Sequence, residues 1–304
     1  MRFIQNIPVL FILFLSSSGF AQSEPTVELT PMDGGEKPCL ECHDNSKVKS
    51  ILNTPHFVAA DAHSPAANQA CESCHGASKE HSLFPQSVSA LRFGMQSDSS
   101  AETQSGVCLN CHQGDHISWG NSTHASEEIS CTSCHTMHAP RDIVLNPLKE
   151  TEVCFNCHLQ EKLEVNKPYR HPVREGVVTC TDCHNSHGSN GPAELVMDTV
   201  NETCFLCHAE KRGPFVNEHE PVQDSCTHCH TPHGSNVENL LIARPPFLCQ
   251  QCHADHSHTR EAYDFQDLPG GRGSRQNRLL GGSCVNCHSN VHGSNKPGAR
   301  SFRE

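Results

Sequence analysis

Hydrophobic residues form one long run near the start of the chain and are sparse after it. The run extends from Ile7 to Leu15, follows Met1-Arg2 and precedes three serines and the sequence Gly19-Phe20-Ala21. A short basic start, a short apolar run and a small-residue end are typical of a secretory signal peptide. We therefore expect residues 1–21 to be a leader cut after Ala21, and residues 22–38 to form a flexible lead. The run is too short to span a bilayer, so the exported protein should be periplasmic, with no transmembrane segment of its own.

After the leader, the alternation of polar and apolar positions predicts little regular structure. The clearest helical pattern covers Leu148–Val165, where charged residues interleave with apolar ones. Prolines after His171 and Glu220 favour extended backbone at those two residues. The Gly- and Arg-rich stretch Pro269–Gly282 predicts a loop.

The composition points the same way, because the chain has few hydrophobic residues with which to build a core. Only 35% of its residues are hydrophobic and 5% are aromatic, which is low for a globular domain. By composition alone such a chain would be placed among disordered proteins. A folded state therefore needs apolar surface from another source.

The cysteines indicate that source, because all 20 fall in ten Cys-x-x-Cys-His boxes. This spacing is the attachment signature of c-type haem, in which two thiols form thioethers and the histidine becomes the proximal iron ligand. The boxes predict ten covalently bound haems c, with these thioether cysteines: Cys39, Cys42, Cys71, Cys74, Cys108, Cys111, Cys131, Cys134, Cys154, Cys157, Cys180, Cys183, Cys204, Cys207, Cys226, Cys229, Cys249, Cys252, Cys284 and Cys287. The predicted proximal ligands are His43, His75, His112, His135, His158, His184, His208, His230, His253 and His288.

Two other readings use the same cysteines. Zinc ribbons also contain Cys-x-x-Cys pairs, but most of them need no histidine after every pair. An exported chain can hold a disulfide framework, yet cysteines on one turn make strained bridges. Haem is therefore the preferred reading.

The boxes also repeat in pairs, which indicates a quasi-one-dimensional array. The repeat predicts a multihaem cytochrome c of five dihaem units, mostly irregular with short α-helices and negligible β-structure. The decahaem domain should cover residues 39–295, with units at about 39–107, 108–153, 154–203, 204–248 and 249–295 and a tail at 296–304. The tetrapeptide His-Gly-Ser-Asn recurs at 187–190, 233–236 and 292–295, and its glycine predicts a turn.

Ten further histidines recur at fixed places in the repeat, one between the boxes of each pair and one after the second box. They are the candidate distal iron ligands: His56, His81, His124, His138, His171, His187, His219, His233, His258 and His292. His256 competes with His258 for the last place. A histidine three residues after its box lies on the proximal side of that haem, so it should ligate a neighbouring haem. Of the 24 histidines, His63, His116, His228 and His256 remain, and we expect them to be surface residues. As an alternative, His63 and His116 lie near candidate distal ligands in the sequence and could take their place.

Ligation by two histidines leaves no open iron site, so the prediction is an electron carrier and not an enzyme, with no catalytic residues. A nitrite or hydroxylamine reductase would need a vacant or Lys-ligated iron, and no Cys-x-x-Cys-Lys box is present. The net charge is −12, which argues against nucleic acid as a partner. A soluble electron store or shuttle remains an alternative.

Several stretches beyond the boxes resemble a known family. They are Ser118-Trp119, Cys180–Ser189, Cys207–Pro214, Cys249–His253 and Asn286–Asn295. Together with the boxes they are similar to the periplasmic decahaem subunits of porin–cytochrome conduits, the MtrA/DmsE/PioA group, over about residues 39–295. His63 and His116 are additional to the family pattern.

The resemblance implies an all-histidine axial set, and residue matching places the distal ligands on the same ten positions as the count above. It also implies a haem chain inside an outer-membrane β-barrel porin. Such a chain would exchange electrons with periplasmic and cell-surface multihaem cytochromes or a surface reductase, in extracellular or anaerobic respiration.

Overall fold

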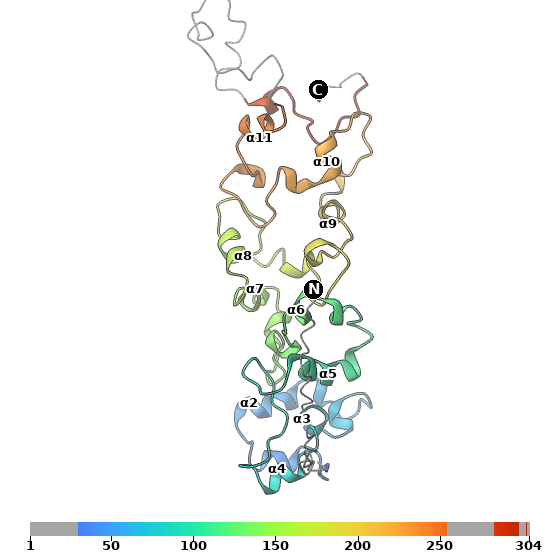
Figure 1. Ribbon diagram of the computed structural model, residues 1–304, viewed down its shortest axis with the longest axis vertical. Helices are drawn as coiled ribbons and strands as arrows, with labels where there is room; N and C mark the ends of the chain where they lie inside the picture. Colours follow the sequence, from blue (N-terminus) through green and yellow to red (C-terminus); the bar gives the residue numbers. More distant parts are fainter. Residues whose placement is uncertain (1–29, 254–282, 298–301, 303–304) are drawn as a thin grey trace, which may run out of the picture.

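The computed structural model describes residues 30–253, 283–297 and 302. The expected leader, residues 22–29 of the lead, His256, His258 and the Pro269–Gly282 stretch lie outside the described residues. The described chain forms an elongated body in which the colours of the sequence follow one another along the long axis (Figure 1). Successive stretches of sequence are thus stacked end to end.

Helices in this body are short, and the longest α-helix, α5, has 12 residues. The described α-helices are α1 Lys37–Leu40, α2 Ser46–Lys49, α3 Glu72–His75, α4 Lys79–Leu83, α5 Ala101–His112, α6 Thr123–Ser126, α7 Glu150–Cys154, α8 Leu159–Glu164, α9 Val200–Phe205, α10 Glu220–Asp224 and α11 Phe247–Gln250. The described 3-10 turns are η1 Ser50–Asn53, η2 Pro55–Phe57, η3 Pro65–Ala67, η4 Trp119–Asn121, η5 Cys131–Ser133, η6 Ile143–Leu145, η7 Cys180–Asp182, η8 Pro192–Glu194, η9 Ala209–Lys211, η10 Cys226–His228, η11 Glu238–Leu240 and η13 Cys284–Asn286.

The two boxes of a pair use different turns. First boxes lie at or near the carboxyl ends of α-helices, as in α5, α7 and α9, whereas most second boxes begin a 3-10 turn, as in η5, η7 and η10. In both cases the histidine N–H donates to the carbonyl of the first cysteine, for example His184 to Cys180 at 2.9 Å. One helical turn places residues i, i+3 and i+4 on one face, so both thiols and the imidazole point to the same side.

The predicted fold class, short helices with negligible β-structure, is confirmed. In the described ranges β-pairing is limited to isolated bridges, such as Tyr169 with Ser235 and Asn217 with Ser294. The helical pattern at 148–165 corresponds to two short helices, α7 and α8, with the box that begins at Cys154 between them. One local expectation was wrong. Glu220 is not extended but begins α10, because Pro221 fits the first turn of a helix.

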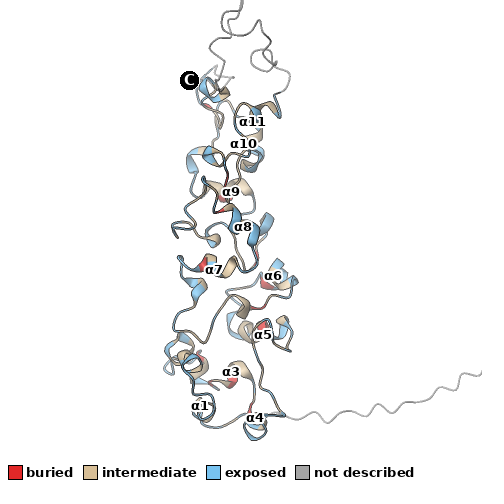
Figure 2. Ribbon diagram, turned by 90° about the vertical axis from the view of Figure 1, so that its left-hand side faces the viewer, coloured by how far each residue is buried: buried red, intermediate tan, exposed pale blue. Residues whose placement is uncertain are grey.

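Side chains supply almost no hydrophobic core. Ala70, Trp119 and Val165 are the buried hydrophobic residues of the described chain, and Figure 2 shows buried segments only as isolated patches. The described part also contains no helix that is both long and apolar enough to cross a membrane. The interior of the body must therefore be filled by a group other than the protein's own side chains.

Candidate haem sites

One continuous cavity of about 6850 Å³ runs through the elongated body. All twenty cysteines and all ten box histidines line it, together with the nine candidate distal histidines that the structure describes. The predicted site residues therefore face one shared space.

The imidazole rings meet across this space in pairs, each made of one box histidine and one candidate distal histidine. Nine pairs have ring centres 6.0–6.3 Å apart: His43 with His81, His112 with His56, His75 with His138, His158 with His124, His135 with His187, His208 with His171, His184 with His233, His253 with His219, and His230 with His292. Direct stacking contact would bring the rings closer than this. An atom held between two imidazole nitrogens at about 2.0–2.1 Å from each would put the ring centres about 6.2 Å apart, so this spacing fits an iron atom.

Hydrogen bonds fix the tautomer of several of these rings. The Nδ1 atoms of His75, His184 and His230 donate to the carbonyls of Leu91, Ala193 and Asn239 at 2.7–2.9 Å. A carbonyl only accepts, so the proton must sit on Nδ1, which leaves the lone pair of Nε2 free to bind a metal.

Candidate distal rings are oriented in the same way. The Nδ1 atoms of His124, His171 and His219 donate to the carbonyls of Ser186, Pro232 and Val291 at 2.8–3.0 Å. Each acceptor residue directly precedes another candidate distal histidine, in the following unit. The backbone thus connects the ligand sets of neighbouring units.

Burial also favours the neutral imidazole. It lowers the pKa of His187 to about 4, with a further contribution from the nearby His116, and it lowers the pKa of His56 and His75. Only the deprotonated nitrogen of an imidazole binds a metal. These rings are therefore ready to act as ligands at neutral pH.

The cysteines establish the order of the sites along the body. Within each unit the first cysteines of the two boxes are neighbours: Cys39 with Cys71, Cys108 with Cys131, Cys154 with Cys180, Cys204 with Cys226, and Cys249 with Cys284. Between units the second cysteines are neighbours, as in Cys74 with Cys111 and Cys183 with Cys207. The two kinds of contact alternate, so the boxes follow each other in sequence order from one end to the other.

Two hydrogen-bond donors on the cavity wall have no partner within the described part of the protein. The Nε atom of Arg170 and the Oγ atom of Ser283 are buried without a hydrogen-bond partner, and both residues line the cavity. A haem carries two propionates, whose oxygens accept such bonds. Together with the thin protein core, these donors show that the residues present fit the group.

The remaining described histidines differ from one another. His63 and His228 are exposed, as expected, but His116 is half-buried, and its ring centre lies 4.1 Å from that of His187.

The sequence analysis did not identify the residues that orient the ligands. Ala193 and Asn239 each follow a box histidine by nine residues in the repeat, and comparing units at that offset would have revealed them.

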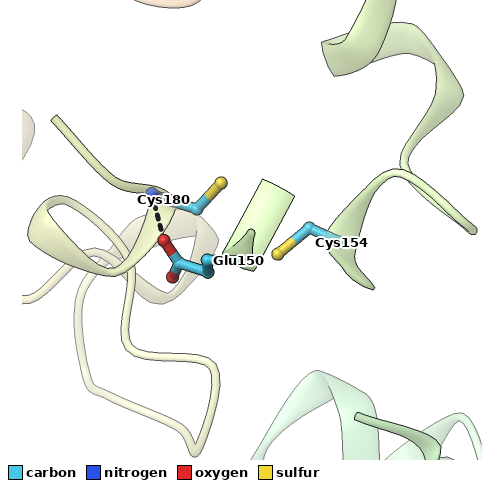
Figure 3. Close-up of side chains that lie close together, drawn as sticks. All are labelled: Glu150, Cys154 and Cys180. Carbon is cyan, nitrogen blue, oxygen red and sulfur yellow. Dashed lines mark hydrogen bonds between the residues drawn. The ribbon is translucent and has the colours of Figure 1, made fainter. Parts of the chain in front are cut away.

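A carboxylate joins two boxes at the middle of the body. Glu150 on α7 lies with Cys154 and Cys180 so that its oxygen and the two sulfurs are all within 4.8 Å of one another (Figure 3). Three such groups can hold a metal ion, but both cysteines belong to haem-attachment boxes, where the sulfurs are used in thioether bonds.

Comparisons with known proteins agree with this geometry. The doubled CXXCH motif family matches residues 171–213 and 219–258, and the cytochrome c-type protein NrfB-like family matches residues 71–149. The chain is 44% identical to the multihaem cytochrome MtrA of Shewanella baltica (strain OS185) over 287 residues, which is 92% of this chain and 86% of the relative. The chain therefore belongs to the MtrA family of multihaem cytochromes c, which bind haem c through their CXXCH motifs and transfer electrons.

Proposed function

We propose that the chain binds ten haems c, each with its iron between two imidazoles, and conducts electrons along its length without catalysis of its own. The observation that carries the proposal is the row of nine imidazole pairs with ring centres 6.0–6.3 Å apart along one cavity. The bound haems supply the electron-accepting irons. The chain holds the axial nitrogens in the correct tautomer and keeps other ligands away from the irons.

The proposed ligation follows a rule that links each unit to its neighbours. A first-box haem takes the histidine between the boxes of the preceding unit, as with His158 and His124. A second-box haem takes the histidine after the second box of the following unit, as with His184 and His233. Each internal unit is thereby bound to both neighbours through iron.

The two ends of the chain lack one neighbour, and the rule changes there. The first haem has no preceding unit, and its His43 pairs with His81 of the same unit. By the same logic we assign His258, the last of the ten candidate distal ligands, to the tenth haem on His288. His258 lies outside the described residues, and His256 is its competitor.

An electron path of this kind suits passage through a membrane barrier. We infer a periplasmic protein, exported by its leader, that sits in an outer-membrane β-barrel porin and connects periplasmic cytochromes with surface cytochromes or a surface reductase in extracellular or anaerobic respiration. Similarity to a multihaem cytochrome MtrA supports this placement, and a porin lumen is polar enough to accept an acidic rod. A soluble electron shuttle without a barrel is the second candidate, because a net charge of −12 also suits transient docking with a basic partner.

Mass and spectroscopy test the proposal together. Intact-mass measurement of the exported protein should show ten covalent haems, and the reduced protein should bind almost no carbon monoxide, because a six-coordinate iron has no vacant position. Fewer haems would contradict the count. Substantial carbon monoxide binding would favour a nitrite or hydroxylamine reductase. Co-purification with a porin separates the conduit from the soluble shuttle.

A further inference from the structure

Glu150 places a carboxylate inside the body at the contact between two haem-attachment boxes. Glu150 is 3% exposed. Its Oε2 and Oε1 atoms accept hydrogen bonds from the backbone N–H groups of Cys180 and Thr181, each at 3.2 Å. It belongs to the helix that leads into the box at Cys154. One side chain thus lies beside the sulfur of Cys154 in the fifth box and hydrogen-bonds to the backbone of the sixth box (Figure 3).

The same structural task is performed without charge in two other units. The N–H of Cys131 donates to the hydroxyl of Ser105 at 3.3 Å, and the N–H of Cys226 donates to the amide oxygen of Asn201 at 2.8 Å. Ser105 and Asn201 each lie three residues before their own first box, close to the position of Glu150. Holding the second box therefore does not require a carboxylate.

Burial of a carboxylate is rare in this chain. Among the described residues only Glu72 and Glu150 are buried acidic residues. The oxygens of Glu72 accept the N–H groups of Met32 and Ser78, so this side chain serves its own unit and the lead. Glu150 alone of the two joins the boxes of a pair.

We propose that Glu150 is an electrostatic residue that lowers the reduction potentials of the fifth and sixth haems. Reduction of each haem adds one electron and converts Fe(III) to Fe(II), which removes one positive charge next to the carboxylate. A buried anion is screened less than one in water, so it stabilises the oxidised haem more than the reduced haem. The inference rests on the proposed haems at Cys154 and Cys180.

The consequence is a pair of haems with lower reduction potentials at the centre of the haem chain. The fifth and sixth boxes have four boxes on either side, so an electron travelling in either direction must cross this pair. Haems that are harder to reduce there would remain oxidised until the flanking haems fill. The pair would then keep the two halves of the chain apart at low electron supply.

Three variants separate charge from structure. Glu150→Gln keeps the size of the side chain and removes the charge. Glu150→Asp keeps the charge. Glu152→Gln removes an exposed charge two residues away, which forms an ion pair with Lys149 at the surface. The measurement is a spectroelectrochemical titration of each full-length haem-loaded protein, fitted as a sum of one-electron steps.

Glu150→Gln should raise two of the potentials, each by about tenfold in the reduction equilibrium constant, which is about 59 mV for one electron. Coulomb's law gives a change of this size for unit charges on the order of 10 Å apart at an effective dielectric constant of about 20. Glu150→Asp should keep both potentials near those of the parent protein. Glu152→Gln should move them far less than Glu150→Gln.

Equal shifts in Glu150→Gln and Glu152→Gln would overturn the inference, as would a larger change in Glu150→Asp than in Glu150→Gln. If Glu150→Gln does not accumulate, Asn201→Asp supplies the inverse test, because the added charge should lower the potentials of the seventh and eighth haems. Unchanged potentials of the seventh and eighth haems in Asn201→Asp would also contradict the inference. Unmoved potentials in a Glu150→Gln protein with ten haems and low-spin spectra refute the role of Glu150 alone, whereas fewer than ten haems in the parent protein refute the proposed function.

Discussion

The junctions between units differ between the two ends of the body. From the second unit onward, a histidine between boxes donates its Nδ1 proton to the carbonyl just before the next unit's candidate ligand, as His171 does to Pro232 at 2.8 Å. At the junction of the first two units the direction is reversed, and the Nδ1 atom of His138 donates to the carbonyl of Val48 at 3.1 Å. The ring centres are 6.1 Å apart at the first junction and 6.3 Å apart at the junction of His171, so nearly the same ring spacing is reached by two different backbone arrangements.

A glycine accounts for the difference. Regular junctions contain His-Gly-Ser, whereas His138 is followed by Ala139 and Pro140. At Gly188 the backbone has φ +103°, and a Cβ would meet the carbonyl oxygen of Ser118 at 2.7 Å. At Gly234 a Cβ would overlap with the carbonyl of Glu164. Only a residue without a side chain allows this close approach, so a junction with alanine must pass by another route.

Ligand exchange should have the largest effect, and it should be alike in both regions. His171→Met and His138→Met each replace one proposed imidazole ligand by a thioether, which stabilises the reduced iron. Each variant should raise one potential by on the order of 100 mV, within the range of about 0.8 V that axial ligands span, and keep ten haems by mass. Redox titration measures the shift. Exposed His63 offers the control, and unchanged potentials in His171→Met would exclude the ligand role.

A side chain at Gly234 should disturb only a junction of the His-Gly-Ser type, because the backbone there lies against the carbonyl of Glu164. Gly234→Ala forces the backbone away from Glu164, which weakens the bridge between Tyr169 and Ser235 and withdraws the Pro232 carbonyl from His171. Overpacking of this kind costs about 1–3 kcal/mol, or a melting temperature lower by several degrees. A shift in the haem that we assign to His208 and His171 should accompany it. Thermal unfolding followed by circular dichroism and electron paramagnetic resonance of the ferric protein measure the two effects.

The matched control is Gly120→Ala. A Cβ there has no atom within 4 Å, so stability and spectra should stay as in the parent protein. If both glycine variants behave alike, the His-Gly-Ser junction does not depend on close approach.

Periodic features of the chain could be read from the sequence, and spatial ones could not. Ten boxes, the paired repeat, the sparse helices and the ten candidate distal histidines follow from spacing alone. The spacing does not reveal which rings face each other, because the partners of a pair are up to 63 residues apart in the sequence, as His75 and His138 are. The helical pattern at 148–165 does not show where α7 ends and α8 begins. Half-buried His116 was expected at the surface, since a single histidine carries no signal of its surroundings.

The smallest effect should come from the acceptor of a proximal ring, where the second unit again differs from the third and fourth. His135 donates Nδ1 to a carboxylate oxygen of Asp142 at 2.6 Å, whereas His184 and His230 donate to carbonyls. A charged acceptor gives the imidazole more anionic character and stabilises the oxidised iron. Asp142→Asn should therefore raise the potential of the fourth haem by up to about tenfold in its reduction equilibrium constant, about 59 mV. Asp115→Asn is the control, because its carboxylate lies 3.7 Å from the Nδ1 atom of His112, beyond hydrogen-bonding distance. Equal shifts in the two variants would mean that net charge, and not this bond, distinguishes the second unit.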